Sequence, residues 1–390
     1  MASASGDTSR PDDNAPAEQR GGRLVYLEAA RGIASIVVLL HHLVLAFKPA
    51  LDLPFPRGLQ ATPLYGLING GAAVAFFFTL SGFVLSLSLI RSPSRGRLAT
   101  SLVKRLPRLA LPVVVTLLAG CLILMAGYRH YIATAGLTGS GWLATFGNAK
   151  FPVNFAPSLL DATRNSVLVF FLGHKFYYNS NLWTMRGEYL CSLAALSGAY
   201  LVGRFIGRKW ICLAAILAVC TGLILANTGL ALSEFGIGMA LAIVYRAWRI
   251  ILPPAAVATL AAVAAGLVVI DDARLEAVAA GLLVLAMTAS NGLERALSGP
   301  IGYWLGRASF PLYLVHTLVI VTIGSEVYTA AFAAAHTYWL AMAVASLVVV
   351  TVSAGAALPL MWLDEWWVPT LNRIIDRLMQ PVRRLVHPAE

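Results

Sequence analysis

Ten apolar runs separated by polar segments organise this sequence of 390 residues. They cover approximately residues 24–47, 71–90, 109–127, 183–203, 210–226, 232–248, 252–270, 277–290, 309–330 and 338–363. A helix of about 20 apolar residues crosses a hydrocarbon core about 30 Å thick, and lipid forces its backbone groups to pair within the segment. With 58% apolar and 12% charged residues, the chain is too apolar for a soluble domain. The sequence therefore predicts an all-α membrane protein, a polytopic bundle of about ten transmembrane helices.

The distribution of basic residues predicts the orientation of this bundle. The formal net charge is +11 at pH 7, and the Lys and Arg residues lie mainly between the apolar runs. Alternate assignment of these segments to two sides gives twenty basic residues on one side and eight on the other. The positive-inside rule places the richer side in the cytoplasm. We expect a multi-pass plasma (inner) membrane protein with both termini cytoplasmic, surrounded by membrane lipids and without a nucleic-acid partner.

Three regions follow from these runs. Residues 1–22 are rich in Ser, Asp, Pro, Gly and Ala and contain no apolar block, which predicts a disordered cytoplasmic tail rather than a signal peptide. Residues 23–365 form the transmembrane domain. Residues 366–390 form a basic cytoplasmic tail. No further soluble domain is expected, so any chemistry belongs to the membrane bundle or its rims.

One more segment, residues 156–172, is apolar in its second half. It contains Asp161 and Arg164, and charged residues are costly inside a lipid-facing span. We therefore interpret this segment as a re-entrant or surface helix rather than as a transmembrane helix.

The first apolar run carries an arginine near one end and a histidine pair deep inside. At about 100° per residue, Arg31, Ser35 and His42 fall on one helix face, whereas His41 does not. His42 lies roughly 16 Å further along the axis than Arg31, near the middle of the hydrocarbon core if Arg31 lies at its boundary. A polar residue at that depth indicates a functional site. The alternative is a structural histidine that is hydrogen-bonded to a neighbouring helix.

Two arginines begin the third helix at its expected cytoplasmic face. Arg105 and Arg108 are three residues apart and share a helix face, and Pro107 suits a first helical turn. Arginines at this place can bind phosphate groups bidentately, with help from the amides at a helix start. The alternative is that they set topology and contact anionic lipids.

A carboxylate, Glu188, enters the membrane at the start of the fourth run, behind Trp183. It is either a functional group or part of an interfacial anchor in which it pairs with Arg186.

A second polar face lies on the ninth run. Ser309, Tyr313 and His316 are spaced i, i+4 and i+7 on an otherwise apolar helix. A histidine that faces lipid without a partner costs several kcal/mol. Two membrane helices with deep histidines, His42 and His316, therefore predict a shared polar interior.

Five motifs in order resemble those of acyltransferase family 3. They are Leu27–His42, Phe76–Phe83, Lys104–Arg108, Trp183–Glu188 and Ser309–His316. The resemblance spans about residues 24–365. It implies about ten membrane helices and an enzyme that moves acyl groups, commonly acetyl from acetyl-CoA, onto hydroxyls of extracytoplasmic glycans, lipids or small metabolites.

The resemblance also assigns roles. The family's pattern of an arginine, ten residues and a histidine falls on Arg31 and His42, the same histidine that the helix face selects. It implies that Arg105 and Arg108 are basic residues of the donor site, and that Glu188, Tyr313 and His316 belong to the pocket. Two departures concern Ala75, where many members have an acidic residue, and the pair Arg186-Gly187, where a small or apolar pair is more usual.

The sequence thus predicts a membrane-bound acyltransferase. Acyl-CoA is expected to place its phosphates on Arg31, Arg105 and Arg108, and His42 to act as general base on the acceptor hydroxyl. The alternative is that His42 accepts the acyl group transiently. We expect Tyr313 to stabilise the oxyanion. The acceptor, a glycan or small molecule, is expected to enter from the opposite side near Trp183 and Glu188. No metal is expected, and the sequence carries no signal for an oligomeric state.

The alternative from another class of protein is a proton-coupled transporter or flippase, in which buried histidines relay protons. The sequence shows no inverted repeat and no paired Gly- or Pro-broken helices of the kind that such transporters use. These observations favour the enzyme.

Overall fold

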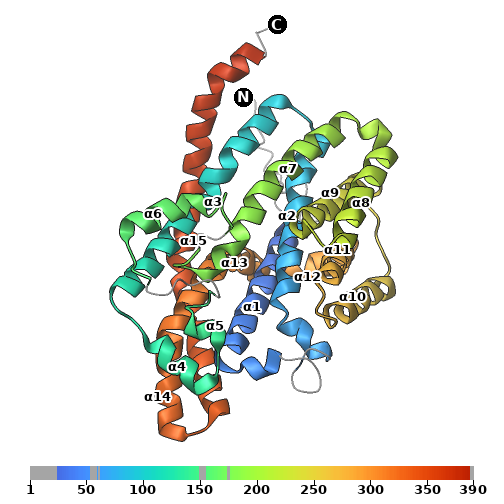
Figure 1. The fold of residues 1–390 in the computed structure, drawn as a ribbon. Coiled ribbons are helices and arrows are strands. Elements are labelled where there is room, and N and C mark those ends of the chain that lie inside the picture. The colour runs from blue at the N-terminus through green and yellow to red at the C-terminus, as the bar shows by residue number, and fades with distance from the viewer. Residues whose placement is uncertain (1–23, 53–58, 60–61, 149–154, 174–175, 387–390) are drawn as a thin grey trace, which may run out of the picture.

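The computed structural model describes residues 24–52, 59, 62–148, 155–173 and 176–386, and these residues form a helical bundle without strands (Figure 1). The predicted tail of residues 1–22 lies outside this set. The α-helices are α1 (Val25–Phe47), α2 (Gly70–Arg91), α3 (Arg95–Met125), α4 (His130–Thr138), α5 (Gly141–Ala144), α6 (Leu159–Leu168), α7 (Met185–Arg204), α8 (Lys209–Leu225), α9 (Leu230–Trp248), α10 (Pro254–Val268), α11 (Ala273–Thr288), α12 (Asn291–Leu297), α13 (Pro300–Val319), α14 (Ser325–Ala335) and α15 (Tyr338–Val386). Shorter 3₁₀ segments are η1 (Pro49–Asp52), η2 (Pro63–Leu67), η3 (Ser180–Thr184) and η4 (Ile206–Arg208), and η5 (Ile320–Gly324) is a π-helical turn.

Most of the predicted apolar runs form helices that are long enough to cross a membrane. Among the described residues, seven segments meet the requirements of length and hydropathy: α1, α2, α3, Ile206–Leu225, α9, Pro300–Ala335 and Tyr338–Met379. The pair α11 and α12, bent by 86°, makes an eighth if it counts as one span. The all-α membrane bundle is therefore confirmed, with seven or eight clear spans where the sequence predicts about ten.

The other predicted runs are helical but are not ordinary spans. Helix α10 has 15 residues and α11 has 16, so each extends only about 23 Å, less than the hydrocarbon thickness. Helix α7 has 20 residues, but Arg186 and Glu188 fall within its first turn. Short length and early charges therefore account for the difference between ten runs and seven or eight spans.

The segment 156–172 contains the short helix α6, which has 10 residues and is about 15 Å long. It packs against α3 (Figure 1). Asp161 in its first turn accepts hydrogen bonds from Asn165 Nδ2 and from Tyr178 Oη, both at 2.9 Å. Because the helix is too short to span and its carboxylate is paired locally, α6 agrees with the prediction that this segment does not cross the membrane.

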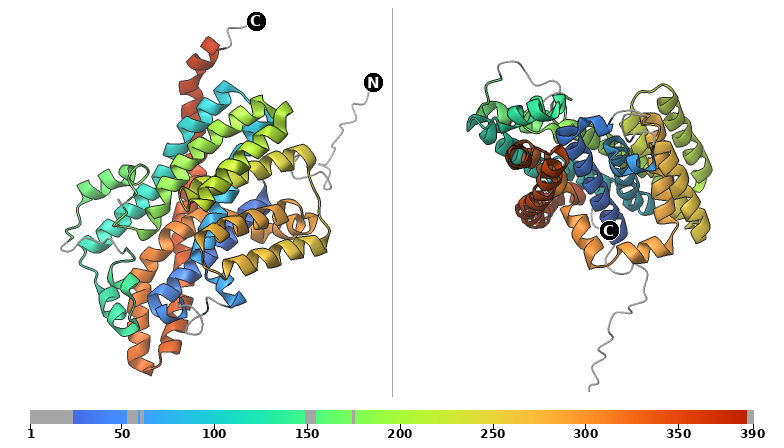
Figure 2. Two further views of the ribbon diagram at one scale, coloured as in Figure 1. Left: turned by 45° about the vertical axis from the view of Figure 1, so that its right-hand side comes forward. Right: turned by 90° about the horizontal axis from the view of Figure 1, so that it is seen from below.

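Helix α1 is the central helix of the bundle, between α15 on one side and α8 to α10 on the other (Figure 2). Its closest partner is α13, because glycines lie at their crossing. A Cβ added to Gly32 would be 2.4 Å from the carbonyl oxygen of Leu305, and one added to Gly306 would be 2.6 Å from Cβ of Glu28. Small residues let membrane helices approach in this way. The two helices that carry the deep histidines are thereby brought together.

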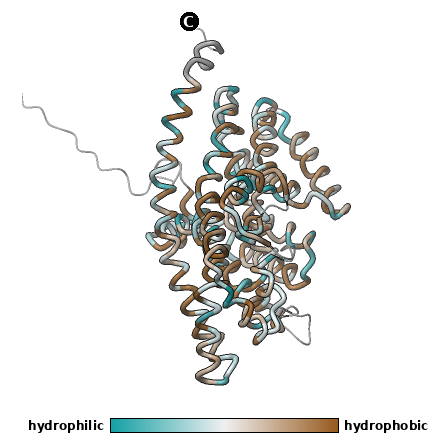
Figure 3. The backbone as a smooth tube through the Cα atoms, turned by 60° about the vertical axis from the view of Figure 1, so that its left-hand side comes forward, coloured by the Kyte–Doolittle hydropathy of each residue, from teal (hydrophilic) through white to brown (hydrophobic). Residues whose placement is uncertain are grey.

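The bundle has two chemically different ends. The turn from α2 into α3 and the C-terminal part of α15 lie at one end, which we name the basic end, and α4, α5 and α14 lie at the other (Figure 1). At the basic end, Trp367 Nε1 donates to the carbonyl of Pro107 at 2.8 Å, and Lys104 Nζ lies 3.9 Å from the Asp376 carboxylate. Figure 3 shows hydrophobic residues along the middle of the helices and hydrophilic residues mainly toward their ends.

The predicted boundary between residues 365 and 366 falls inside a helix. Helix α15 continues without a break from Tyr338 to Val386, and Trp367 is bonded to α3. The segment that the sequence assigns to a cytoplasmic tail is thus helical up to Val386, in continuation of the last membrane helix.

Candidate active site

Helices α1 and α13 bring His42 and His316 into direct contact, although 274 positions separate them in the sequence. Nε2 of His316 lies 3.0 Å from Nδ1 of His42, and the ring centroids are 5.1 Å apart. His316 is fully buried, whereas His42 is partly accessible. The predicted shared polar interior thus exists as a pair of histidines, which we call the histidine dyad.

The neighbouring carbonyl groups determine which ring nitrogens carry protons. Nδ1 of His42 lies 2.9 Å from Val38 O, and Nδ1 of His316 lies 3.0 Å from Leu312 O. A carbonyl oxygen can only accept, so both Nδ1 atoms are donors. Nε2 of neutral His316 must then accept from the Nδ1–H of His42. Nε2 of His42 keeps its lone pair, and among the described residues it has no hydrogen-bond partner. His42 is therefore arranged as a base.

His41 has a different task. Its Nδ1 lies 2.8 Å from the carbonyl oxygen of Ile68, just before α2, and its ring leaves no room for a Cβ on Gly70, which would come within 2.6 Å of it. His41 therefore fixes the start of α2. This agrees with the prediction that His41 and His42 lie on different faces of α1.

A polar network holds the dyad-bearing part of α13 against the segment before α7. Asn179 Nδ2 donates to Leu314 O at 2.8 Å, and Asn181 Nδ2 donates to Tyr313 O at 2.6 Å and to Thr317 Oγ1 at 3.0 Å. Asn179 also caps η3 by accepting from Asn181 N. All of these side chains are buried. Because each bond joins η3 to α13, the network sets the position of the α13 turn that carries His316.

Tyr313 is part of this network, and its position argues against the predicted oxyanion role. Its hydroxyl donates to the carbonyl of Asn181 at 2.7 Å and lies 2.8 Å from Thr184 Oγ1. The phenolic proton is therefore already engaged by a backbone acceptor. Tyr313 holds η3 in place, and its ring lies 6.1 Å from that of His316 between centroids and lines a large cavity.

This cavity has a volume of about 1170 Å³, and its wall runs from Tyr313 to Arg91 and Arg97 on either side of the α2–α3 turn. Its walls contain eight arginines and four carboxylates. They are Arg31, Arg91, Arg97, Arg105, Arg108, Arg246, Arg249 and Arg307, with Glu28, Glu188, Asp364 and Glu365. The three arginines that the sequence predicts for a donor site thus line one strongly basic cavity.

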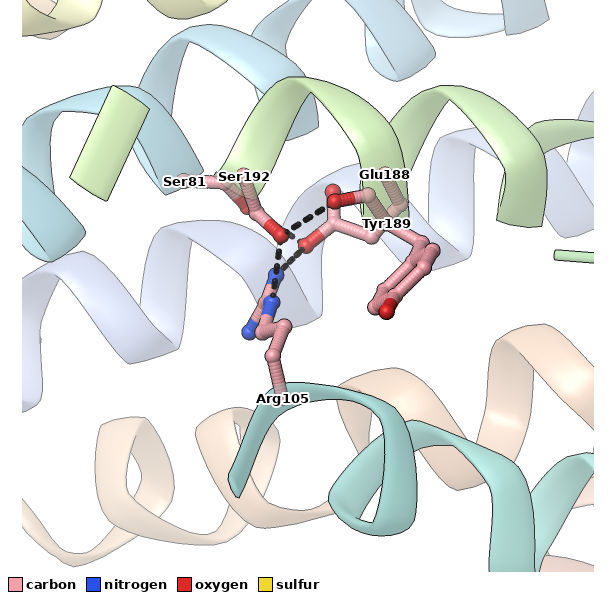
Figure 4. A network of polar contacts seen from close by, with 5 residues as sticks. All are labelled: Ser81, Arg105, Glu188, Tyr189 and Ser192. Atoms are coloured by element: carbon pink, nitrogen blue, oxygen red, sulfur yellow. Dashed lines mark hydrogen bonds and ion pairs between the residues drawn. The ribbon is translucent and has the colours of Figure 1, made fainter. Parts of the chain in front are cut away.

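Figure 4 shows how one of these arginines is fixed. Arg105 Nη2 donates to the carboxylate of Glu188, and its Nε donates to Ser192 Oγ at 2.8 Å. Ser81 Oγ donates to the same carboxylate at 3.3 Å. The guanidinium is therefore held in one orientation by groups from α2 and α7.

The alternative in which Glu188 pairs with Arg186 is not what the structure shows. Arg186 donates to the carbonyl of Phe171 at 3.0 Å instead. Glu188 also lies in the wall of the arginine cavity, not at a separate acceptor entrance, and Trp183 is 51% exposed and outside that wall. The reason is that Glu188 faces inward to α3, whereas Trp183 and Arg186 are exposed on the surface.

Several residues of the site had no clear signal in the sequence. Arg307 pairs with Glu365 and lies beside Tyr303, with its guanidinium carbon 5.4 Å from the ring centroid. Its Nε and that of Arg31 are buried and have no hydrogen-bond partner among the described residues. Trp142 of α5 lies against His42, with ring centroids 5.2 Å apart. Only the position of Arg307, two residues before Ser309 in a recognised motif, could have drawn attention to it.

In the part of the chain that the structure describes, no cluster of three or more His, Cys, Asp or Glu residues is arranged to hold a metal ion.

Comparison with known proteins agrees with this arrangement. A family model described as an acyltransferase domain matches residues 24–357, which include α1, the eight arginines of the cavity and the dyad. No curated protein and no solved structure matches the chain. The match covers most of the sequence and contains all five motifs. The chain belongs to acyltransferase family 3 and is a multi-pass membrane acyltransferase.

Proposed function

We propose that the protein transfers an acyl group, acetyl in the first instance, from acyl-CoA to a hydroxyl of an extracytoplasmic glycan, lipid-linked sugar or small metabolite, with His42 as general base. One observation carries the proposal: a large arginine-lined cavity ends at Tyr313, beside the His42–His316 dyad. The two features supply a site for a polyanionic donor and a base next to it.

The cavity suits coenzyme A by charge and by size. Its eight arginines outnumber its four carboxylates, and arginine binds phosphate bidentately. Its volume of about 1170 Å³ exceeds that of most small-ligand pockets, which hold roughly 300–1,000 Å³. The Nε atoms of Arg31 and Arg307 are buried donors without a hydrogen-bond partner among the described residues. Because buried polar groups are normally satisfied, a bound phosphate is a suitable acceptor for them.

The pantetheine arm would leave the phosphates near the basic end and reach inward. Phe77 and Tyr313, whose ring centroids are 6.0 Å apart, line the inner part of the cavity. Aromatic walls are compatible with an uncharged arm and not with phosphates. The thioester would thereby arrive beside the dyad.

The reaction then proceeds as acyl transfer. The acceptor hydroxyl donates its proton to Nε2 of His42 while its oxygen attacks the thioester carbonyl carbon. A C–O bond forms and the C–S bond breaks, so the products are an ester and the CoA thiolate, which takes the proton from His42. During the step, Nδ1–H of His42 is held by Val38 O and by Nε2 of His316. This bond keeps the ring oriented and helps to carry its transient charge.

The basic end is proposed to face the cytoplasm. The α2–α3 turn and the end of α15 meet there, and the count of basic residues favours that side. Cytoplasmic acyl-CoA would then enter the cavity directly, and both termini would be cytoplasmic in the plasma membrane.

The test is acyl transfer by purified protein in proteoliposomes. Radiolabelled acetyl-CoA is supplied with methyl glycosides as hydroxyl acceptors, and labelled ester and free CoA are measured. The proposal predicts both products in equal amounts, with product formation reduced to near background in the His42→Ala variant. Absence of ester from folded wild-type protein with every hydroxyl acceptor would contradict it.

A further inference from the structure

The dyad is also contacted by residues that do not line the arginine cavity, Trp142 of α5 and Asn181 of η3. Trp142 of α5 packs on the imidazole of His42, with ring centroids 5.2 Å apart and ring planes inclined by 36°. It belongs to the end of the bundle opposite the basic end (Figure 1). An acceptor hydroxyl that is hydrogen-bonded to Nε2 of His42 must therefore lie close to this indole.

Hydrogen bonds of the α5 segment fix the backbone that carries the Trp142 indole. Ser140 caps α5 by accepting from Leu143 N at 3.0 Å, and its hydroxyl donates to Leu45 O of α1 at 2.5 Å. Gly147 N donates to Trp142 O at 2.8 Å and closes the turn after α5. These bonds tie α5 to the helix that carries His42, so the ring is a fixed wall.

Two unsatisfied polar atoms lie on η3. Ser180 Oγ and Asn181 Oδ1 are buried, with residue exposures of 6% and 1%, and have no hydrogen-bond partner among the described residues. A Cβ on Gly147 would be 2.8 Å from Ser180 Oγ and 2.8 Å from Trp142 Cζ2, so the hydroxyl and the indole edge are neighbours. Asn181 Nδ2 lies 3.5 Å from Nδ1 of His316. Buried polar atoms without partners are uncommon, and these two can bond the hydroxyls of a bound molecule.

We propose that Trp142, Ser180 and Asn181 form the acceptor site, and that the acceptor is a sugar ring. The C–H face of a pyranose packs on the indole, as apolar ring faces do on aromatic side chains. Ser180 and Asn181 bond its hydroxyls, and the reacting hydroxyl donates to Nε2 of His42. The inference rests on the proposed function and replaces the expected acceptor site near Trp183 and Glu188.

The experiment compares two tryptophans in the same proteoliposome assay. Transfer from labelled acetyl-CoA is measured with methyl β-glucoside, a pyranoside, and with sorbitol, an acyclic polyol, for wild type, Trp142→Ala, Trp142→Phe and Trp183→Ala. Trp183 is the matched control because it is 51% exposed and lies outside the cavity wall. Folded protein is quantified by monodisperse elution in detergent, and the donor KM is measured for every variant.

The acceptor site predicts a selective loss. Trp142→Ala should lower kcat/KM for the pyranoside by roughly 10-fold or more, leave the donor KM within about 2-fold, and change the rate with sorbitol much less. Trp142→Phe should recover most of the loss, and Trp183→Ala should behave as wild type. Ser180→Ala, which removes a hydroxyl without a partner, should lower kcat/KM for the pyranoside while the protein stays folded.

The outcomes separate this inference from the function on which it rests. Suppose that wild type transfers acetyl but folded Trp142→Ala keeps its kcat/KM for the pyranoside, or loses as much activity with sorbitol as with the pyranoside. The proposed sugar site is then wrong, while the proposed acyltransferase function stands. A loss in Trp183→Ala instead would restore the site expected from the sequence. If wild type forms no ester with either acceptor, the proposed function fails together with the site.

Discussion

Nε2 of His316 accepts a hydrogen bond from Nδ1 of His42 across 3.0 Å, and this contact joins the central helix α1 to α13. It leaves Nε2 of His42 as the unprotonated nitrogen of the dyad. The contact assigns different tasks to the two histidines. In the proposed mechanism His42 is the base, and His316 is a positioning residue that acts through it.

Replacement of His316 by alanine should therefore lower kcat without a large change in the donor KM. The loss of one neutral hydrogen bond to His42 corresponds to roughly 1 kcal/mol, or about 5- to 10-fold in kcat. His316→Gln, which can offer an acceptor to Nδ1–H, should recover part of the rate. Steady-state kinetics in proteoliposomes measure both. A loss as large as that of His42→Ala would mean that His316 itself is the base.

Removal of Arg108 should raise the donor KM. Arg108 lines the cavity and, among the described residues, has no ion pair or hydrogen bond, so its replacement by alanine removes a ligand contact and no structural one. A charge-assisted contact with phosphate is worth about 1.5–3 kcal/mol, which predicts roughly a 10- to 100-fold increase in the KM for acetyl-CoA with kcat nearly unchanged.

Arg186 is the control for this change, because it is also an exposed arginine but lies outside the cavity wall and donates to Phe171 O. Arg186→Ala should leave the donor KM unchanged. If Arg108→Ala and Arg186→Ala behave alike, the arginines of the basic end only set topology.

Tyr313→Phe separates a structural role from an oxyanion role. The variant removes the hydrogen bond to Asn181 O, so it should lower the melting temperature of the purified protein through a loss of about 1 kcal/mol. Turnover per folded molecule should stay within about 3-fold of wild type. An oxyanion donor would instead cost roughly 10²- to 10³-fold in kcat, and that result would reinstate the prediction from the sequence.

The orientation of the bundle can be measured by cysteine labelling. Ser94 caps α3 at the basic end, and Thr138 ends α4 at the opposite end. With the basic end in the cytoplasm, an impermeant maleimide added to whole cells should label Thr138→Cys and not Ser94→Cys. Labelling of both, or of Ser94→Cys alone, contradicts the proposed topology.

The sequence predicted the helices and the faces on which the deep residues lie. Apolar length located all ten helical regions, and the 3.6-residue period separated His42 from His41, which the structure places on different partners. These features depend on local periodicity and on the cost of polar groups in lipid. Both can be assessed from the sequence of one helix without knowledge of its neighbours.

The partners of charged residues could not be predicted in this way. The sequence offered Arg186, two positions away, as an alternative partner of Glu188, but Glu188 pairs with Arg105, 83 positions away. Periodicity gives the face of a helix but not its rotation against a neighbour. The same reason explains why Trp142 was missed: α5 has four residues, too few for any periodic signal, and it reaches His42 only through tertiary packing.

The central claim, that Nε2 of His42 is the base, is tested most directly by turnover per folded molecule of His42→Ala beside His41→Ala. His42→Ala should elute as folded protein and bind acetyl-CoA normally, yet lose roughly 10²- to 10⁴-fold in kcat. His41→Ala removes the bond to Ile68 O and should lose stability but little turnover. A folded His42→Ala protein with turnover near that of wild type would contradict the mechanism.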